Sequence, residues 1–365
     1  MHNKFLILFL FILATLTLWT QEEDNSNKLL KHIDAELYLE TYYGFDFGNP
    51  ASHERPDFLY SFHRHNELNL NLGLVQFIFD NEKIRSNFGL MSGTYANKNL
   101  ADEPSLYRNI YQANIGVKLS QSKNLWVDAG ILESHIGFEG AKGADYNFMT
   151  RSILADNSPY YSAGVQVSYI NSDQSWYFAG LVLNGWQRIQ RVQGNQTPAF
   201  GHQITWTPDD KLKVNSSSFI GNDFPTDERR MRYFHNFYIE LDKSKSSYAL
   251  GFDAGVQQAG FQSDNYHEWL GALFEFTRHL SDDFDIGFRG EYFFDPNRVI
   301  IETPLMGRFE NMGLTVNLDW KIDDHVLLRL DARSFKNTSD VYLFNDEAVD
   351  NNFYIGASFS FQIQN

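Results

Sequence analysis

Apolar and polar residues alternate along most of this chain. The pattern is clearest in residues 353–364, where phenylalanine, isoleucine and alanine occupy the odd positions, and tyrosine, glycine, serine and glutamine occupy the even ones. Successive side chains of a β-strand point to opposite faces, so this segment predicts a strand with one apolar and one polar face. Sixteen segments follow the rule and predict sixteen strands.

The connections between the predicted strands alternate in length. Strands are expected at residues 35–45, 62–77, 84–95, 110–119, 125–134, 160–170, 176–185, 199–207, 211–221, 231–241, 247–257, 268–278, 283–294, 309–321, 325–335 and 352–364. Short polar turns are expected at 80–83, 120–124, 171–175, 207–210, 242–246, 281–282 and 322–324. Long loops are expected at 46–61, 96–109, 135–159, 186–198, 222–230, 258–267, 295–308 and 336–351.

The alternation of short turns and long loops favours a membrane barrel over a soluble β-sandwich. Such a barrel shows one face to lipid and the other to its lumen, with short turns on one side of the membrane and long loops on the other. We therefore predict an all-β fold, a transmembrane antiparallel up-and-down β-barrel of about 16 strands in a bacterial outer membrane. An even strand number puts both termini on the short-turn side, which is periplasmic.

The start of the chain predicts an exported protein. One lysine precedes an apolar run from Phe5 to Leu18, which is typical of a cleaved signal peptide and too short for a membrane helix. We expect a signal peptide at 1–20, a short periplasmic segment at 21–34 and the barrel at 35–365. The chain has no cysteine, which excludes disulfides, thiolate metal sites and a catalytic thiol.

Charged residues within the strands indicate which face meets the lumen. A lysine or arginine that faces lipid at mid-membrane costs about 2–4 kcal/mol, so strand charges are expected to point inward. The inward acids are Glu36, Glu40, Glu67, Asp128, Glu240, Asp253, Glu275, Asp285, Glu291, Asp319 and Asp331, and the inward bases are Arg85, Lys118, Lys211, Lys213, Arg232, Arg289, Arg329 and Arg333. Glu133, His235 and Arg278 are exceptions near strand ends. The excess of acids predicts a weak cation preference.

The loop at 135–159 is the longest expected loop and combines glycines, charges and apolar residues that need burial. We expect it to fold into the barrel and constrict the pore, with Arg151 facing acids across the lumen. A short helix is expected from Asn147 to Ala155, with Asn147 as its N-cap. The alternative is a surface loop that packs on its neighbours.

The candidate pore-lining and constriction residues come from the strands and from this loop. They are Glu36, Glu40, Glu67, Arg85, Lys118, Asp128, Glu139, Arg151, Asp156, Arg232, Asp253, Arg289, Glu291, Arg329, Asp331 and Arg333.

Two other residue sets suggest different chemistry. His63, His65 and Glu67 alternate on one predicted strand face and form a weak metal-site candidate. Side chains on one face are nearly 7 Å apart, so they splay and a structural hydrogen-bond network is the better interpretation. Ser152, His135 and Asp156 share one loop, but a triad is recognised by geometry, and no nucleophile-elbow or zinc-protease motif is present.

Several motifs resemble the putative β-barrel porin-2, OmpL-like family. The similar segments are His63–Leu72, Asp128–Ile131 with Ser134–Glu139, Thr150–Ser152 with Ser158–Tyr161, and Leu183–Gln187. The resemblance is strongest over residues 36–225 and more diffuse toward the carboxyl end. It implies an outer-membrane porin and supplies no substrate or catalytic residues.

We therefore expect a porin for passive diffusion of small hydrophilic solutes, without enzymatic activity or a cofactor. Its expected partners are outer-membrane lipid and lipopolysaccharide, the barrel-assembly machinery, small hydrophilic solutes and other copies in a homo-oligomer. The net charge of −16 argues against nucleic acid. The alternatives are a non-conducting barrel that serves as a surface anchor or adhesin and, less favoured, an outer-membrane hydrolase.

Overall fold

The computed structural model describes residues 31–303, 305 and 307–364. The predicted signal peptide at 1–20 and most of the predicted segment at 21–34 lie outside these residues. The first described strand begins at Ile33.

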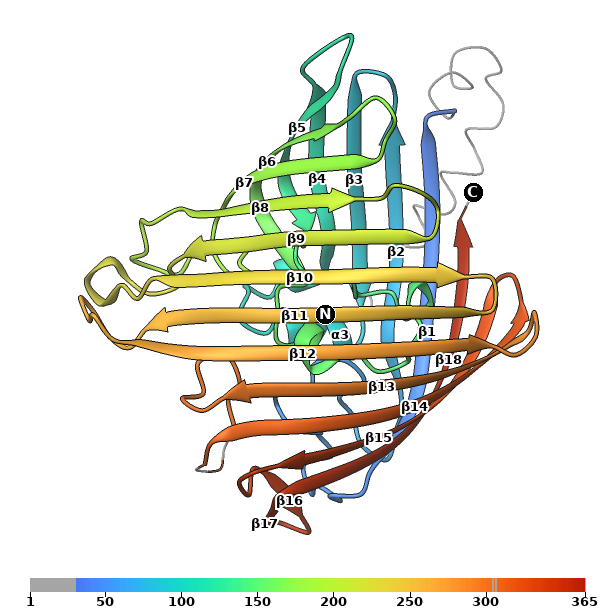
Figure 1. The fold of residues 1–365 in the computed structure, drawn as a ribbon, viewed down its shortest axis with the longest axis vertical. Helices are drawn as coiled ribbons and strands as arrows, with labels where there is room; N and C mark the ends of the chain where they lie inside the picture. Colours follow the sequence, from blue (N-terminus) through green and yellow to red (C-terminus); the bar gives the residue numbers. More distant parts are fainter. Residues whose placement is uncertain (1–30, 304, 306, 365) are drawn as a thin grey trace.

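Sixteen strands form a closed antiparallel barrel, as predicted (Figure 1). They are β1 (Ile33–Asp46), β2 (Leu68–Asp80), β3 (Ile84–Ser92), β4 (Ile110–Lys118), β5 (Asn124–Glu133), β6 (Tyr161–Ile170), β7 (Trp176–Leu183), β8 (Ala199–Trp206), β9 (Leu212–Gly221), β10 (Arg232–Lys243), β11 (Ser246–Gln258), β12 (Tyr266–His279), β13 (Phe284–Asp295), β14 (Phe309–Asp323), β15 (Val326–Asn337) and β18 (Asn351–Gln364). Neighbours in the chain are neighbours in the wall, and β18 pairs with both β15 and β1.

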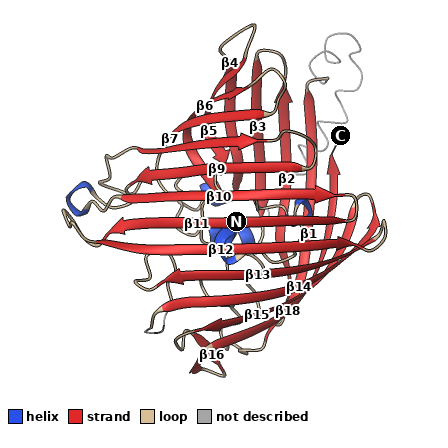
Figure 2. Ribbon diagram, viewed as in Figure 1, coloured by secondary structure: helices blue, strands red, loops and turns tan. Residues whose placement is uncertain are grey.

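The remaining elements are short and lie in the connections (Figure 2). They are the helices α3 (Thr94–Asn99) and α4 (Ile153–Asp156), the 3-10 turns η1 (Tyr107–Asn109), η2 (Gly143–Asp145) and η3 (Thr226–Glu228), and the hairpin of β16 (Tyr342–Phe344) with β17 (Glu347–Val349). No helix in the described part of the chain has the length and hydropathy needed to cross a membrane.

The two faces of the wall differ in polarity, as the alternation predicts. On β11, Leu250 and Phe252 are exposed, whereas Asp253 is buried. On β14, Leu314 is exposed and Asn317 is buried. An apolar outer face around a polar inner face is the arrangement expected of a wall surrounded by lipid.

Strand β2 departs from the predicted strand at 62–77. It starts at Leu68, and its pairing with β1 shifts at a β-bulge between Glu40 and Thr41. Leu68 is 77% exposed, whereas Leu72 and Leu74 are buried beside Tyr38. An extra residue in one strand moves the following side chains to the other face. The regular spacing of the leucines therefore does not place them all on one face.

The short turns lie at one end of the barrel and the long loops lie at the other. Both ends of the described chain are at the short-turn end, because Glu36 near the start of β1 pairs with Gln364 at the end of β18.

The interior differs between these two ends. Near the loops, the inward-facing Phe219, Phe234 and Trp269 pack in one apolar cluster with Phe58 from the first loop. Near the short turns the inner face carries partly exposed charges. There the ion pair between Lys213 and Glu240 has a distance of 3.0 Å, and its side chains are 45% and 30% exposed. Charged side chains thus face the interior at the turn end, as the alternation of these strands predicts.

Candidate functional site

Residues 134–160, called the inner loop below, lie inside the barrel. The loop leaves the wall at β5 and returns at β6, yet its middle bonds to residues of β14 and β15. Strands β6 and β14 are separated by seven strands on both sides of the closed ring. The inner loop therefore crosses the full width of the barrel.

Polar side chains of β14 and β15 hold the middle of the inner loop. Arg329 donates to the carbonyl oxygens of Gly143 at 2.6 Å and Phe148 at 3.1 Å, and also to that of Tyr146. Asn317 accepts from the Met149 N–H at 3.1 Å. These bonds satisfy backbone groups that would otherwise be buried without partners.

Strand β1 holds the loop at a second place. Lys142 forms an ion pair with Glu36 at 2.7 Å, and the Ala144 N–H donates to the Tyr38 hydroxyl at 3.1 Å. Glu40 lies against Gly143 so closely that a Cβ there would be 2.2 Å from its carboxylate oxygen. Only glycine fits at that position without a shift of the loop or of the Glu40 side chain.

A buried charge cluster holds the end of the loop that leads to α4. Arg289 on β13 lies 3.6–3.7 Å from Glu139, Glu275 and Glu291 and donates to the Thr150 carbonyl at 2.7 Å. Glu291 also accepts from the N–H of Ile153, the first residue of α4, at 2.7 Å.

The neighbouring Arg333 completes this cluster. It lies 2.8 Å from Glu291 and donates to the carbonyl of Arg151 at 2.9 Å. Together the two wall arginines therefore bind both the loop backbone and the wall carboxylates.

Arg151 has a different place from the one expected. Its guanidinium donates to the carbonyls of Gly140 at 2.7 Å, Met149 at 2.9 Å and Ala141 at 3.1 Å, so it braces the inner loop internally. It does not face acids across an open lumen, because the loop folds around it and leaves it fully buried.

The helix expected from Asn147 to Ala155 is shorter in the structure. Helix α4 covers Ile153–Asp156, and Ser152 is its N-cap, accepting from the Ala155 N–H at 3.1 Å. The residues before Ser152 bond to the wall through their backbone, and those bonds replace the helical ones.

Apolar side chains of the inner loop fit against inward-facing glycines of the wall. A Cβ at Gly287 would lie 2.9 Å from the Phe148 ring, and a Cβ at Gly271 would lie 2.9 Å from the Leu154 side chain. Both glycines lie on strands, β13 and β12, that pair with each other. The wall is thus shaped to receive the loop.

Burial alters the titration of two groups in the inner loop. It raises the pKa of Asp156 to about 7, and this carboxylate accepts from the hydroxyls of Tyr160 at 3.2 Å and Ser61 at 3.4 Å. Burial lowers the pKa of His135 to about 4, which leaves the ring neutral at pH 7. Asp156 is therefore a loop group whose charge changes near neutral pH.

Most other candidate residues lie on the inner face of the wall. Arg85 bonds to Asp128 at 2.6 Å, and Lys118 lies over the Trp126 ring at 5.9 Å. The remaining pairs are Arg232 with Asp223 at 3.4 Å, Asp253 with Asn236 at 2.7 Å, Asp319 with Arg329 at 3.0 Å and Asp331 with Thr150 at 3.2 Å.

Two residues were wrongly placed in the wall. Glu67 precedes β2 and is held at the barrel rim by Arg64 at 2.6 Å and Asn69 at 2.7 Å. The strand prediction began too early because His63–Glu67 alternates without being paired as a strand. Lys211 is exposed in the turn before β9.

His63, His65 and Glu67 do not converge on one site. His63 Nδ1 bonds to the Leu59 carbonyl at 2.9 Å, whereas His65 Nδ1 accepts from the Asp46 N–H at 2.9 Å. The network interpretation holds for these three residues, because each bonds to a different part of the structure.

Ser152, His135 and Asp156 also have separate partners. The Ser152 hydroxyl bonds to Glu139, and His135 Nε2 bonds to the Ser218 carbonyl at 2.8 Å. Asp156 bonds to Ser61 and Tyr160. The structure does not bring the three together as a triad.

Uncharged residues that hold the inner loop were missed. Asn317 and Thr150 bond the loop to the wall, but the candidate residues predicted from the sequence are all charged. Asn317 lies on the polar face of a strand whose alternation is clear, so counting all inward polar residues would have included it.

Comparisons with solved structures show the same fold. OmpT of Vibrio cholerae in a trimer form has 11% identity and a TM-score of 0.59, covering 90% of this chain and 99% of that chain. An anion-selective porin from Comamonas acidovorans has 5% identity and a TM-score of 0.59, covering 91% and 99%. The outer membrane channel DcaP of Acinetobacter baumannii has 9% identity and a TM-score of 0.56, covering 90% and 97%.

A comparison with curated proteins gave no match. A sequence model of the family described as "Putative beta-barrel porin-2, OmpL-like" matches residues 32–363. This range includes all sixteen strands of the wall apart from Gln364, the last residue of β18. By this match, and with the closed barrel of the fold, the chain belongs to the putative beta-barrel porin-2, OmpL-like family.

Proposed function

We propose that this protein is an outer-membrane porin for passive diffusion of small hydrophilic solutes, in which the inner loop restricts the pore. The observation that carries the proposal is the course of that loop, which crosses the barrel and bonds to β1, β13, β14 and β15. A segment across the lumen sets the size of what passes beside it. Membership of a porin family supports the same function.

The test is single-channel conductance of the refolded protein in a planar bilayer. One variant replaces residues 139–157 by a short glycine-serine linker, and a matched control shortens the exposed loop at 260–264. We expect steady steps from the wild type, steps several-fold larger from the first variant and unchanged steps from the control. Equal steps from all three proteins would contradict a constricting loop.

A non-conducting barrel that serves as a surface anchor is the second candidate function. It is favoured by the apolar cluster that packs the interior near the long loops, including Phe234 and Trp269. Absence of steps from wild type and from the loop-replaced variant, with both proteins folded, would support it. An outer-membrane hydrolase has no such observation in its favour.

We propose that the pore prefers cations weakly, since inward acids outnumber inward bases. Glu240 at the turn end is the acid best placed to act, because it is 30% exposed beside Lys213. Glu240→Gln should shift the reversal potential in a salt gradient toward anions. Glu347→Gln, at an exposed position of β17, should leave the reversal potential unchanged. A shift of equal size in both variants would contradict a role for Glu240.

We also propose that the barrel self-associates, and that β8, β9 and β10 form the contact. His202, Ser218 and His235 are at positions paired across these strands, on the face that carries the exposed Phe200 and Tyr233. The His202 ring bonds to Ser218 at 2.5 Å, and its centroid lies 6.0 Å from that of His235. Polar groups on a lipid-facing surface are costly unless a second surface covers them.

The mass of the detergent-solubilised protein tests this contact. Wild type should form an oligomer, and the double variant His202→Leu with His235→Leu should be a monomer. Thr41→Leu, on the outer face of β1, should not change the mass. A monomeric wild type, or an oligomeric double variant, would overturn the proposed interface.

A further inference from the structure

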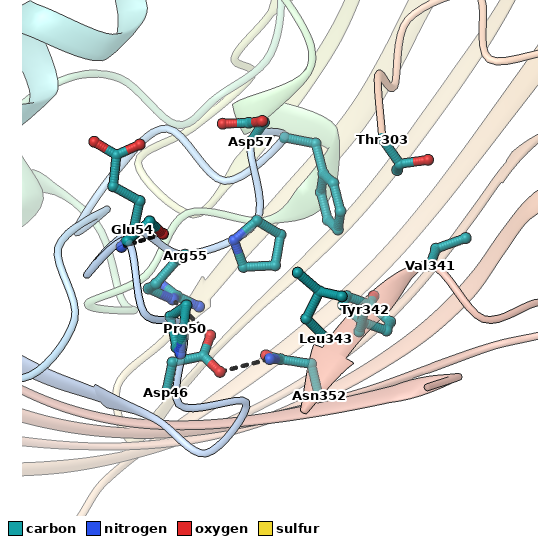
Figure 3. A pocket seen from close by; sticks show the side chains of 13 residues that line it. Asp46, Pro50, Glu54, Arg55, Asp57, Thr303, Val341, Tyr342, Leu343 and Asn352 are labelled. Atoms are coloured by element: carbon teal, nitrogen blue, oxygen red, sulfur yellow. Dashed lines mark hydrogen bonds and ion pairs between the residues drawn. The ribbon is translucent and has the colours of Figure 1, made fainter. Parts of the chain in front are cut away.

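The first long loop brings three metal-ligating side chains together outside the inner-loop site. One ligand atom each from Glu54, Asp57 and His63 lies within 4.8 Å of the others. Figure 3 shows the carboxylates of Glu54 and Asp57 along one edge of a pocket of about 270 Å³ that also involves the last loop. The two acids are exposed, whereas only 3% of the His63 surface is exposed.

The orientation of His63 is that of a metal ligand. Its Nδ1 donates to the Leu59 carbonyl at 2.9 Å, because a carbonyl can only accept. In the neutral ring this bond leaves a lone pair on Nε2, which is buried and has no hydrogen-bond partner. Histidines that bind metals usually donate their other ring N–H to a carbonyl or carboxylate, which fixes the tautomer and the direction of the ring.

The Nε2 lone pair points at a second acceptor. Nε2 lies 3.5 Å from Glu54 Oε2. Two atoms that both accept hydrogen bonds therefore face each other, unless a cation or a proton lies between them. Two ligands bound tetrahedrally to zinc at about 2.0–2.1 Å are themselves separated by roughly 3.4 Å. The observed separation therefore suits a metal ion without rearrangement of these two side chains.

The surrounding charged side chains orient the ligand atoms and indicate a position for a cation. Arg64 binds the other Glu54 oxygen, Oε1, at 3.1 Å and so directs Oε2 toward His63. Lys98 from α3 lies 2.9 Å from Asp57 and 3.9 Å from Glu54 Oε2, which shows that this position favours a positive charge. The lysine is on a flexible stem and can be displaced by a divalent ion.

We propose that Glu54, Asp57 and His63 form a binding site for a divalent first-row transition metal such as Zn²⁺, with Lys98 as the competing cation. One imidazole and two carboxylates suit zinc better than calcium or magnesium, since nitrogen ligands disfavour the harder ions. Metal binding would replace the ion pairs between the first loop and α3 by bonds within the first loop.

The experiment is a calorimetric titration of Zn²⁺ into the tag-free, chelator-stripped full-length protein in detergent. We expect one zinc per chain, loss of at least about tenfold in affinity for His63→Ala, and a gain for Lys98→Met, which removes the competing charge. His53→Ala changes a neighbouring exposed histidine outside the ligand set and should bind as wild type does. Mg²⁺ should give no comparable binding.

Asp57→Asn provides a second test if His63→Ala does not fold, because Asp57 is 60% exposed and its loss should leave the barrel intact. It should weaken zinc binding, and heat-modifiable migration should confirm folding. The proposal is overturned if wild type takes up no stoichiometric zinc, or if the folded His63 or Asp57 variants bind zinc with unchanged affinity.

Discussion

Arg289 extends from β13 into the interior, where three carboxylates lie within 3.7 Å of its guanidinium. All four side chains are almost fully buried. Removing one partner of a buried ionic group leaves the remaining charges uncompensated, which typically costs about 3–5 kcal/mol. This arginine therefore stabilises both the wall and the inner loop that contributes Glu139.

Arg289→Gln should lower the free energy of unfolding by about 3–5 kcal/mol, because the carboxylates lose their shared cation. Urea unfolding of the refolded protein in lipid vesicles measures the change. Arg229→Gln, at an exposed position, is the matched control and should be within about 0.5 kcal/mol of wild type. Equal stability of the two variants would show that the cluster contributes little.

The raised pKa of Asp156 predicts a pH-dependent inner loop. An acid whose pKa rises from about 3.9 to about 7 on folding contributes stability that is complete below the lower value and is lost as pH rises through the higher one. Wild type should therefore melt at a lower temperature at pH 8 than at pH 5. Asp156→Asn should melt above wild type at pH 8.

Below about pH 3 the two proteins should melt together, since the carboxyl is then largely neutral in both states. The exposed Asp227→Asn serves as the control and should follow wild type at every pH. A pH-independent difference between Asp156→Asn and wild type would rule out the titration of this group as the cause.

The inward direction of the charged strand residues was predictable from the sequence, whereas their bonding partners were not. Arg289 and Glu291 alternate with apolar neighbours on β13, and the cost of a charge in lipid sends both inward. Whether Arg289 pairs with a wall residue or with the inner loop depends on the path of a loop that bonds to the opposite wall. Arg151 illustrates the same limit, because its partners are carbonyls of its own loop.

At the scale of elements, the inner loop and the wall are complementary in shape. Phe148 occupies the space left by Gly287 on β13, and Leu154 occupies that left by Gly271 on β12. Packed interiors leave little room for added atoms, so a larger residue at either glycine must displace the loop side chain that packs against it.

Gly287→Val should enlarge the conductance steps, because its side chain would occupy the position of the Phe148 ring and push the inner loop from the wall. Single-channel recording measures the change. Gly290→Val is on the same strand but its Cβ would meet only Leu314, at 3.9 Å, so it should conduct as wild type does. Unchanged steps from a folded Gly287→Val protein would argue against a loop that limits the pore.

Strand number and the alternation of turns and loops followed from periodicity, because lipid imposes it on every wall strand. The bulge beside Asn71 could not be predicted from this periodicity. An extra residue leaves the local composition unchanged, yet it moves Leu72 and Leu74 to the inside. The segment His63–Glu67 alternates like a strand, yet it has no paired neighbour along its length other than the single bridge of Arg64 to Glu54.

At the scale of the whole molecule, the long loops and the short turns lie at opposite ends of the barrel. We expect the loops outside the cell and the turns in the periplasm, as in other barrels of outer membranes. The chain has no cysteine, so single cysteines can report on each end without background. Asp264 lies in a loop and Lys123 in a turn, and both are exposed.

Asp264→Cys should react with a membrane-impermeant maleimide on intact cells, because it should face the medium. Lys123→Cys should react only after the outer membrane is opened. Labelling of lysed cells is the control that both thiols are reactive. The reverse pattern on intact cells would show that the barrel has the opposite orientation.

The order of the strands in the chain also determines the order in which contacts within the barrel can form. The inner loop follows β5 in the chain, but three of the strands that hold it, β13 to β15, come more than a hundred residues later, and Glu36 meets Gln364 only when the ring closes. During synthesis the loop therefore lacks most of its docking partners, and β1 remains an unpaired edge of the kind that invites aggregation. The last contacts to form are thus those that decide whether the finished barrel is open or filled.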